Sequence, residues 1–175
     1  MTMITNPGAL IFLDLDGPMI PLTNTDKEYV IPTDEFPYNS KMSPEACRHI
    51  ETLCKQFNAA VVTNSTHNNG HGSDREPTFH VFDLFEKNGI SHLLLDGPYM
   101  TAWADIKAAG RKHAVERWLQ AHPEYSDLPF VVFDDNAYNF GDMPDFPFVN
   151  TGEEGISEND IDLAAKHLNN QLTSR

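Results

Sequence analysis

Positive charge is scarce in this 175-residue sequence: 12 Lys and Arg stand against 26 Asp and Glu, so the formal net charge at pH 7 is −14. A surface this acidic repels nucleic acid and anionic membranes, because both carry dense negative charge. We therefore expect no broad nucleic-acid-binding face. A local basic spot, or a metal ion that reverses the charge of one pocket, is still compatible with this composition.

Cysteine and long apolar runs are also scarce. The 2 cysteines, Cys47 and Cys54, cannot form a disulfide framework, and we expect buried thiols in a reducing compartment. No apolar run approaches the ~18 residues of a membrane span, and residues 1–8 lack the basic and apolar regions of a signal peptide. We predict a cytoplasmic protein that does not associate with a membrane, with residues 1–8 as a disordered or vector-derived leader and residues 9–175 as one domain.

Short apolar runs alternate with amphipathic helical patterns along the chain. Runs without polar alternation are typical of strands buried on both faces of a parallel sheet, and they occur at Ala9–Leu13, Ala59–Thr63, His92–Leu95, Phe130–Phe133 and Phe146–Val149. Helical patterns begin near Pro44, Phe79, Gly110 and Ser157. This alternation predicts an α/β fold, a three-layer Rossmann-like sandwich with a mainly parallel central sheet of about five strands.

Two stretches interrupt this alternation. Residues 18–41 contain 4 prolines without periodicity, and we interpret them as a long loop or a small flap. Residues 66–78 are polar and glycine-rich, which favours a mobile loop. For His67, His71 and Arg75 in this loop, solvation is favoured over a second metal site or a phosphate clamp. For Trp103, packing against the sheet is favoured over stacking on a base.

Two of the predicted strands end in paired acids. Asp14 and Asp16 follow one strand, with Gly17 allowing the chain to turn, and Asp134 and Asp135 end another. Residues two apart on a strand face the same side at roughly 6–7 Å, and parallel sheets bind ligands at the carboxyl ends of their strands. Each pair alone is also compatible with a turn or a helix cap. Together they would place four carboxylates at one edge, which requires a cation such as Mg²⁺ to neutralise them.

A basic side chain is needed near such a cluster, and Lys112 is our first choice. It begins the helical pattern just before the second acidic strand, so it can reach over the end of the sheet. Lys107 and Arg111 are close competitors, and a solvated helix-surface lysine is the ordinary alternative.

Hydroxyl and amide groups follow the strand AAVVT. Thr63 is the first polar residue after its apolar part, and Asn64 and Ser65 come next. Such groups can hydrogen-bond phosphate oxygens, together with backbone N–H groups at the start of the next helix. The same residue types are common at any turn after a strand.

The order of these features resembles the four motifs of the haloacid dehalogenase (HAD) superfamily. The corresponding segments here are IFLDLDG, AAVVTN, GRKHAVERWL and FVVFDDN, within about residues 9–136. The spacing is similar to that of small HAD domains in RNA-repair-like and phage proteins. Because the intervals between the motifs are too short for a large cap domain, the resemblance implies a nearly capless phosphatase with an open site. Pro18, after D-x-D-G, departs from the small aliphatic residue usual there.

The resemblance implies a role for each of these residues. Asp14 would be the nucleophile that forms an aspartyl-phosphate, and Asp16 the general acid/base. Thr63, or Ser65 in its place, and Lys112 would bind the phosphoryl oxygens. The residues that would hold Mg²⁺ are Asp14, Asp16 (through its backbone carbonyl), Asp134 and Asp135, and those that would contact the substrate are Gly17, Asn64 and Ser65.

We therefore expect a Mg²⁺-dependent phosphomonoester hydrolase whose substrate is a phosphorylated small molecule or a nucleic-acid end. A receiver-like phosphoacceptor module is one alternative, disfavoured because its phosphorylated aspartate lies mid-chain. A catalytically silent HAD scaffold is another, disfavoured because all the expected acids are present.

Overall fold

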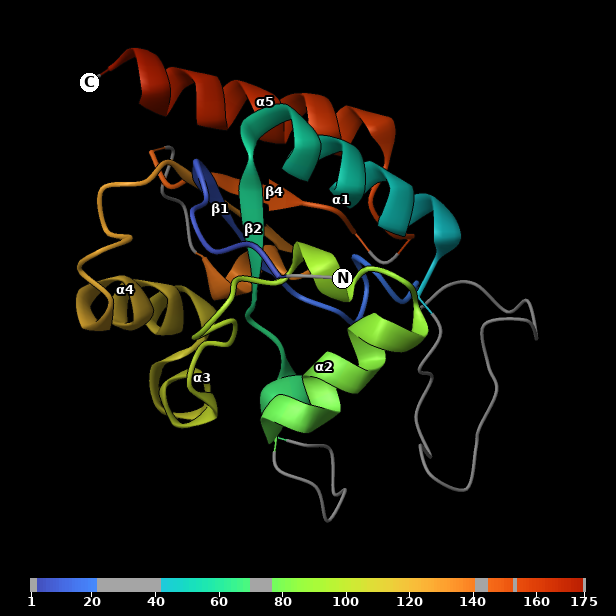
Figure 1. Ribbon diagram of the computed structural model, residues 1–175. Coiled ribbons are helices and arrows are strands. Elements are labelled where there is room, and N and C mark those ends of the chain that lie inside the picture. Colours follow the sequence, from blue (N-terminus) through green and yellow to red (C-terminus); the bar gives the residue numbers. More distant parts are fainter. Residues whose placement is uncertain (1–2, 22–41, 70–76, 141–144, 153, 175) are drawn as a thin grey trace.

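A four-stranded parallel sheet forms the centre of the computed structural model, which describes residues 3–21, 42–69, 77–140, 145–152 and 154–174 (Figure 1). The strand order is β2-β1-β3-β4, and each neighbouring pair is parallel. The strands are β1 (Ala9–Leu13), β2 (Ala59–Thr63), β3 (Phe130–Asp134) and β4 (Phe148–Asn150). The predicted α/β class and parallel sheet are confirmed.

Helices cover both faces of the sheet. They are α1 (Pro44–Phe57), α2 (Pro77–Lys87), α3 (Trp103–Ala109), α4 (Arg111–Ala121) and α5 (Glu158–Thr173). In Figure 1, α1 and α5 lie on one side of the sheet and α3 and α4 on the other. None of the described helices combines the length and apolarity needed to cross a membrane.

Alternate residues of β1 supply the two halves of the core, because successive side chains of a strand point to opposite faces. Ile11 and Leu13 belong to the cluster that includes α1, α2 and α5, whereas Leu10 and Phe12 pack in the cluster that contains Trp118 of α4. These four side chains of β1 are fully buried. A strand covered on both faces has no solvent side, which explains why its sequence shows no polar alternation.

Serine side chains cap two of the predicted helical patterns at their first turns. Ser43 accepts a hydrogen bond from the backbone N–H of Ala46 at the start of α1. Ser157 and Asp160 form a capping box at the start of α5. The helical pattern near Gly110 consists of two helices, α3 and α4, separated by Gly110 itself at φ +86°.

The predicted strand His92–Leu95 is wrong. Ser91–Leu93 form a 3₁₀ turn, and the chain after it touches β2 through isolated bridges of Leu94 to Val61 and Met100 to Thr63. Between these bridges come Gly97 at φ +128° and Pro98, which has no N–H to donate, so a continuous ladder cannot form. The sheet therefore has four strands in the described residues rather than about five.

This edge segment still determines the topology. It lies outside β2, so the order across the sheet is segment 94–100, β2, β1, β3, β4. The chain order reverses between β1 and β3, and parallel α/β sheets place ligand sites at such a reversal, outside the carboxyl ends of the strands. Ile4, within the predicted leader, pairs with Leu95 on the outer side.

Residues 22–41 and 70–76 lie outside the described residues. They contain most of the predicted flap and most of the predicted mobile loop, including His71 and Arg75.

Candidate active site

Three of the four predicted acids meet at the carboxyl end of the sheet. Leu13 of β1 pairs in register with Phe133 of β3, so Asp14 and Asp134 follow at equivalent positions on adjacent strands. Both are buried, at 1% and 0% exposure. Carboxylate oxygens of Asp14, Asp134 and Asp135 lie within 4.8 Å of one another. An all-oxygen set of this kind fits a hard divalent cation such as Mg²⁺.

Gly17 allows the two acidic strand ends to approach each other. Its φ of +89° suits glycine, and a Cβ built there would lie 2.5 Å from the Cβ of Asp135. Gly17 therefore makes room for the Asp135 side chain.

Asp16 lies outside the three-carboxylate group. Its side chain is 38% exposed, and Oδ1 is 3.2 Å from Nε2 of His67. The Thr66 hydroxyl approaches its Oδ2 at 3.5 Å. Asp16 thus faces the open side of the site, while Asp14 faces inward.

Arg111, at the first position of α4, supplies the positive charge of the site. Its Nη1 contacts Oδ2 of Asp14, lies 2.9 Å from Oδ2 of Asp134 and lies 3.4 Å from the carbonyl oxygen of Asn64. The guanidinium therefore bridges the two buried carboxylates that end β1 and β3.

Lys112, the predicted cation, points elsewhere. Its Nζ pairs with Oε1 of Glu116 at 3.0 Å and lies over the ring of Phe146. Successive residues of an α-helix point about 100° apart, so when Arg111 faces the acids its neighbour cannot. The structure therefore places Arg111, one of the two competitors, at the acids in place of Lys112.

Burial dominates the electrostatics of the site. It raises the pKa of Asp14 from 3.8 to about 7, with Arg111 opposing the rise and Asp134 adding to it. Burial also raises the pKa of Asp134, again opposed by Arg111. For Arg111, burial lowers the pKa, but the two carboxylates more than reverse this and the net shift is upward. One buried cation does not fully neutralise two buried carboxylates.

Of the two candidate hydroxyls after β2, the structure brings Ser65 to Asp14. A Ser65 hydrogen bond lowers the pKa of Asp14, whereas the Thr63 hydroxyl donates to Oδ1 of Asn68 at 2.8 Å. Asn64 lies between the two and donates from Nδ2 to the carbonyl of Arg111 at 3.2 Å. Asn64 therefore anchors the residue that carries the buried cation.

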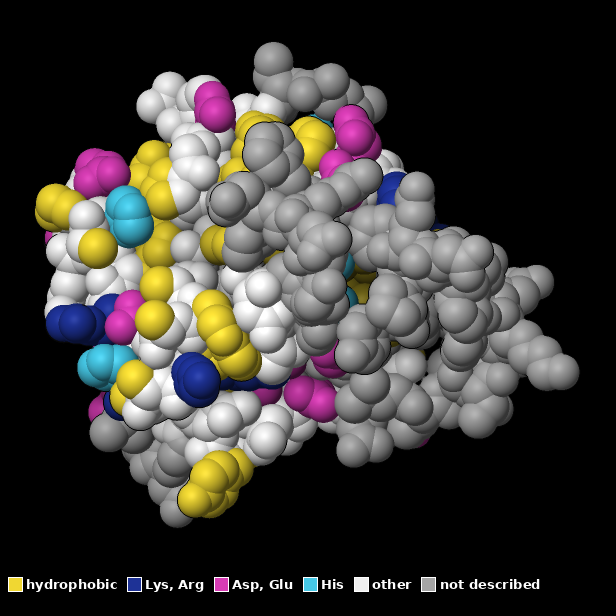
Figure 2. Space-filling view, turned by 90° about the horizontal axis from the view of Figure 1, so that it is seen from below, with side chains coloured by type: hydrophobic (Ala, Val, Ile, Leu, Met, Phe, Trp, Pro, Cys, Tyr) yellow, Lys and Arg dark blue, Asp and Glu magenta, His cyan; other side chains and the backbone are white. Residues whose placement is uncertain are grey.

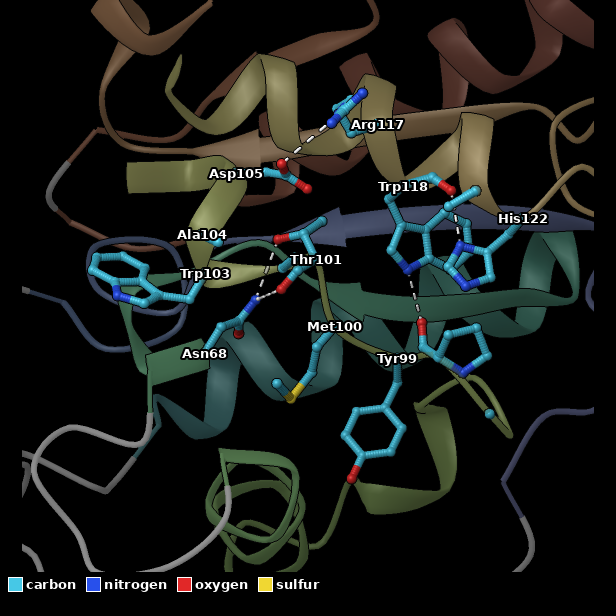
Figure 3. A pocket seen from close by; sticks show the side chains of 14 residues that line it. Asn68, Tyr99, Met100, Thr101, Trp103, Ala104, Asp105, Arg117, Trp118 and His122 are labelled. Carbon is cyan, nitrogen blue, oxygen red and sulfur yellow. Dashed lines mark hydrogen bonds and ion pairs between the residues drawn. The ribbon is translucent and has the colours of Figure 1, made fainter. Parts of the chain in front are cut away.

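An open groove of about 600 Å³ lies between segment 97–105 and α4 (Figure 3), and neither the four site aspartates nor Arg111 is among its lining residues. Asn68 is one of its lining residues, and Nδ2 of Asn68 donates to the carbonyl of Thr101 at 2.9 Å. Trp103 and Trp118 line the groove, and Arg117 lies 3.8 Å from Asp105 at its rim.

His67 is the site residue that the sequence analysis missed. It was predicted as part of a solvated loop, but it lies in a 3₁₀ turn (Thr66–Asn69) and is 3% exposed. The available signal was its position: it follows the end of β2 by only four residues, at the edge of the sheet where the acids meet.

The face that contains the carboxyl ends of the strands is seen in Figure 2. On the described part of this face, Lys and Arg side chains are scattered among acidic and neutral ones. The visible described surface therefore offers no continuous basic patch.

A family model described as the HAD domain in Swiss Army Knife RNA repair proteins matches residues 10–161 of the chain. This range contains both acidic strand ends and Arg111. No curated protein matches the chain, and no solved structure matches it.

Proposed function

The chain belongs to this family of HAD domains, and on that premise we propose that it is a Mg²⁺-dependent phosphomonoester hydrolase with Asp14 as the nucleophile. HAD membership supports a hydrolase in general. The observation that carries the finer proposal is the convergence of two buried carboxylates, Asp14 and Asp134, with the Arg111 guanidinium at the carboxyl end of the sheet.

In the first half of the reaction, a carboxylate oxygen of Asp14 attacks phosphorus and the bond from phosphorus to the leaving oxygen breaks. The leaving oxygen takes its proton from Asp16, which faces the open side of the site. The products are an alcohol and an acyl phosphate on Asp14.

In the second half, water attacks the phosphorus of the acyl phosphate. Asp16, now ionised, accepts the proton of that water, and the bond between phosphorus and Asp14 breaks. Inorganic phosphate leaves, Asp14 is again a carboxylate, and Asp16 is again protonated, so the cycle closes.

Asp14, Asp134 and Asp135 would hold Mg²⁺, with the backbone carbonyl of Asp16 as a further ligand. When bound, the ion supplies positive charge to the transferring phosphoryl group. Arg111 carries a second positive charge at the same place, and Ser65 supplies a hydroxyl that hydrogen-bonds to Asp14.

The substrate class that we propose is a phosphorylated end of a nucleic acid. The family description, RNA repair, supports it. A site that binds a single end needs no broad basic face, which agrees with the net charge of −14. The receiver-like alternative is set aside for two reasons. The chain belongs to a HAD family, and segment 94–100 of this chain lies outside β2.

Hydrolysis of p-nitrophenyl phosphate with and without Mg²⁺ tests the activity. We expect Mg²⁺-dependent turnover that Asp14→Asn lowers by more than about 10³-fold, while Asp127→Asn, at an exposed position, leaves it unchanged. Full activity of Asp14→Asn would contradict the nucleophile assignment. A panel of 5′- and 3′-phosphorylated RNA and DNA ends, nucleotides and sugar phosphates then tests the substrate class, which fails if sugar phosphates are preferred.

A further inference from the structure

Asp16 needs a fixed orientation to protonate a leaving group, and the three-carboxylate group does not supply one. Its carboxylate is 38% exposed, whereas Asp14 and Asp134 are 1% and 0% exposed, and it points toward the open side of the site. A carboxyl group donates its proton efficiently only while it is held in a productive geometry.

Buried histidines stand directly behind this carboxylate. Nε2 of His67 is 3.2 Å from Oδ1 of Asp16, and Nδ1 of His67 is 3.4 Å from Nε2 of His80. The two ring planes are nearly parallel, at 7°, with 5.7 Å between centroids, so the rings meet edge to edge through these nitrogens. His67 is 3% and His80 4% exposed. The three residues come from three segments: the turn after β1, the 3₁₀ turn after β2, and α2.

A histidine suits this position because its two ring nitrogens face two different partners. A neutral imidazole has one donor and one acceptor nitrogen. With the acceptor toward Asp16, His67 accepts a hydrogen bond from the carboxylic acid; with the donor toward Asp16, it donates to the carboxylate. In either case, Nε2 of His80 is the hydrogen-bond partner of Nδ1 of His67.

We propose that His67 and His80 are positioning residues that hold the Asp16 carboxyl group in line with the leaving oxygen. This inference rests on the proposed phosphatase function and deepens it. Neither histidine touches the substrate: His67 orients Asp16, and His80 fixes the ring of His67.

The dependence on the leaving group tests this role. The parameter kcat/KM includes steps only up to departure of the alcohol, so it reports the step in which Asp16 donates its proton. We expect His67→Ala to lower kcat/KM for phenyl phosphate about 30-fold, but for 2,4-dinitrophenyl phosphate less than about threefold, because a good leaving group needs no protonation. An equal loss for both substrates would indicate a merely structural role and would overturn the proposal, as would no loss for either.

Three further variants sharpen the test. His67→Gln offers an amide to Asp16 and should recover most of the phenyl phosphate activity. His80→Phe keeps an aromatic ring at this position but lacks Nε2, so it should show the same selective loss at about tenfold, and it carries the test if His67→Ala does not fold. His92→Ala is the matched control, because His92 is also paired with a carboxylate, Glu51 at 3.7 Å, but lies away from the carboxyl end of the sheet.

A double-mutant cycle separates action through Asp16 from any direct effect. In an Asp16→Ala background, His67→Ala should cause no further loss on phenyl phosphate. A further loss as large as in the wild type would overturn the proposal. If the wild type turns over neither aryl phosphate, the proposed function fails; if it turns over both and the histidine variants lose activity uniformly, only the positioning role fails.

Discussion

Arg111 and Lys112 are adjacent residues with different surroundings, and this makes them a matched pair for mutagenesis. We expect Arg111→Gln to lower kcat/KM for p-nitrophenyl phosphate about 10²-fold or more, because it removes the only described cation in contact with both buried carboxylates. Lys112→Gln breaks a helix-surface pair with Glu116, worth about 0.3–0.5 kcal/mol, and should leave kinetics nearly unchanged. Steady-state kinetics of the two variants decide the assignment, and the opposite ranking would restore Lys112.

The identity of this cation could not be read from the sequence because it depends on helix phase. The sequence predicts a basic residue at the start of the helix after Gly110, and this is correct. Which of two consecutive residues faces the sheet is set by the residue at which the helix begins, and Gly110, at φ +86°, places that start at Arg111. A shift of one residue in the helix start turns the side chains by about 100°.

His67 shows a second limit at the scale of the residue. Glycines and polar residues around it have the composition of a solvated loop. It is buried in contact with His80 of α2, thirteen positions further along the chain, whose Nε2 lies 3.4 Å from Nδ1 of His67. No local pattern in a sequence reports such a tertiary contact.

The turn after β1 has a steric role that a substitution of Gly17 tests. Gly17→Ala meets two costs: strain at φ +89° and a Cβ only 2.5 Å from the Cβ of Asp135. Gly89→Ala meets the strain alone, since its φ is +75° and nothing lies within 4 Å of the added Cβ. We expect Gly89→Ala to lose about 1–2 kcal/mol in the free energy of unfolding, and Gly17→Ala to lose clearly more.

Calorimetric Mg²⁺ titration separates the two glycine variants further. The displaced Asp135 should weaken Mg²⁺ binding in Gly17→Ala, whereas Gly89→Ala should bind as the wild type does. Equal stability and equal Mg²⁺ affinity in the two variants would show that the approach of Gly17 to Asp135 is unimportant.

Among the elements, the strands β1, β2 and β3 were predictable and the segment beside β2 was not. The three central strands are continuous apolar runs because both of their faces are covered. His92–Leu95 has the same composition, but a strand also requires continuous pairing. Gly97 and Pro98 reduce its pairing with β2 to isolated bridges, so burial alone explains its apolar character.

At the scale of the molecule, the buried carboxylates at the strand ends lower the free energy of unfolding by an amount that depends on pH. Asp14 has a pKa of about 7 in the folded protein against 3.8 for an exposed aspartate. Between these values the folded state binds a proton that the unfolded state does not. By linkage, the free energy of unfolding then falls as the pH rises from about 4 to about 7.

Thermal or urea unfolding in EDTA across this pH range measures the effect. We expect the wild type to lose stability toward neutral pH by an amount on the order of a few kcal/mol relative to Asp14→Asn, which has no carboxylate to ionise there. At pH 8 in EDTA, Asp14→Asn should therefore be the more stable protein. Because both proteins contain the same histidines, the contribution of histidine titration cancels when their free energies of unfolding are subtracted.

Mg²⁺ should reverse that ranking. The ion binds the ionised carboxylates of the folded state, so it stabilises the wild type in proportion to RT ln(1 + [Mg²⁺]/Kd) and removes the cost of ionising Asp14. Asp14→Asn lacks one ligand of the three-carboxylate group and should gain less. If Mg²⁺ raised the melting temperature of both proteins equally, the ion would be binding elsewhere on this acidic surface, and the charge balance assigned to the strand ends would be wrong.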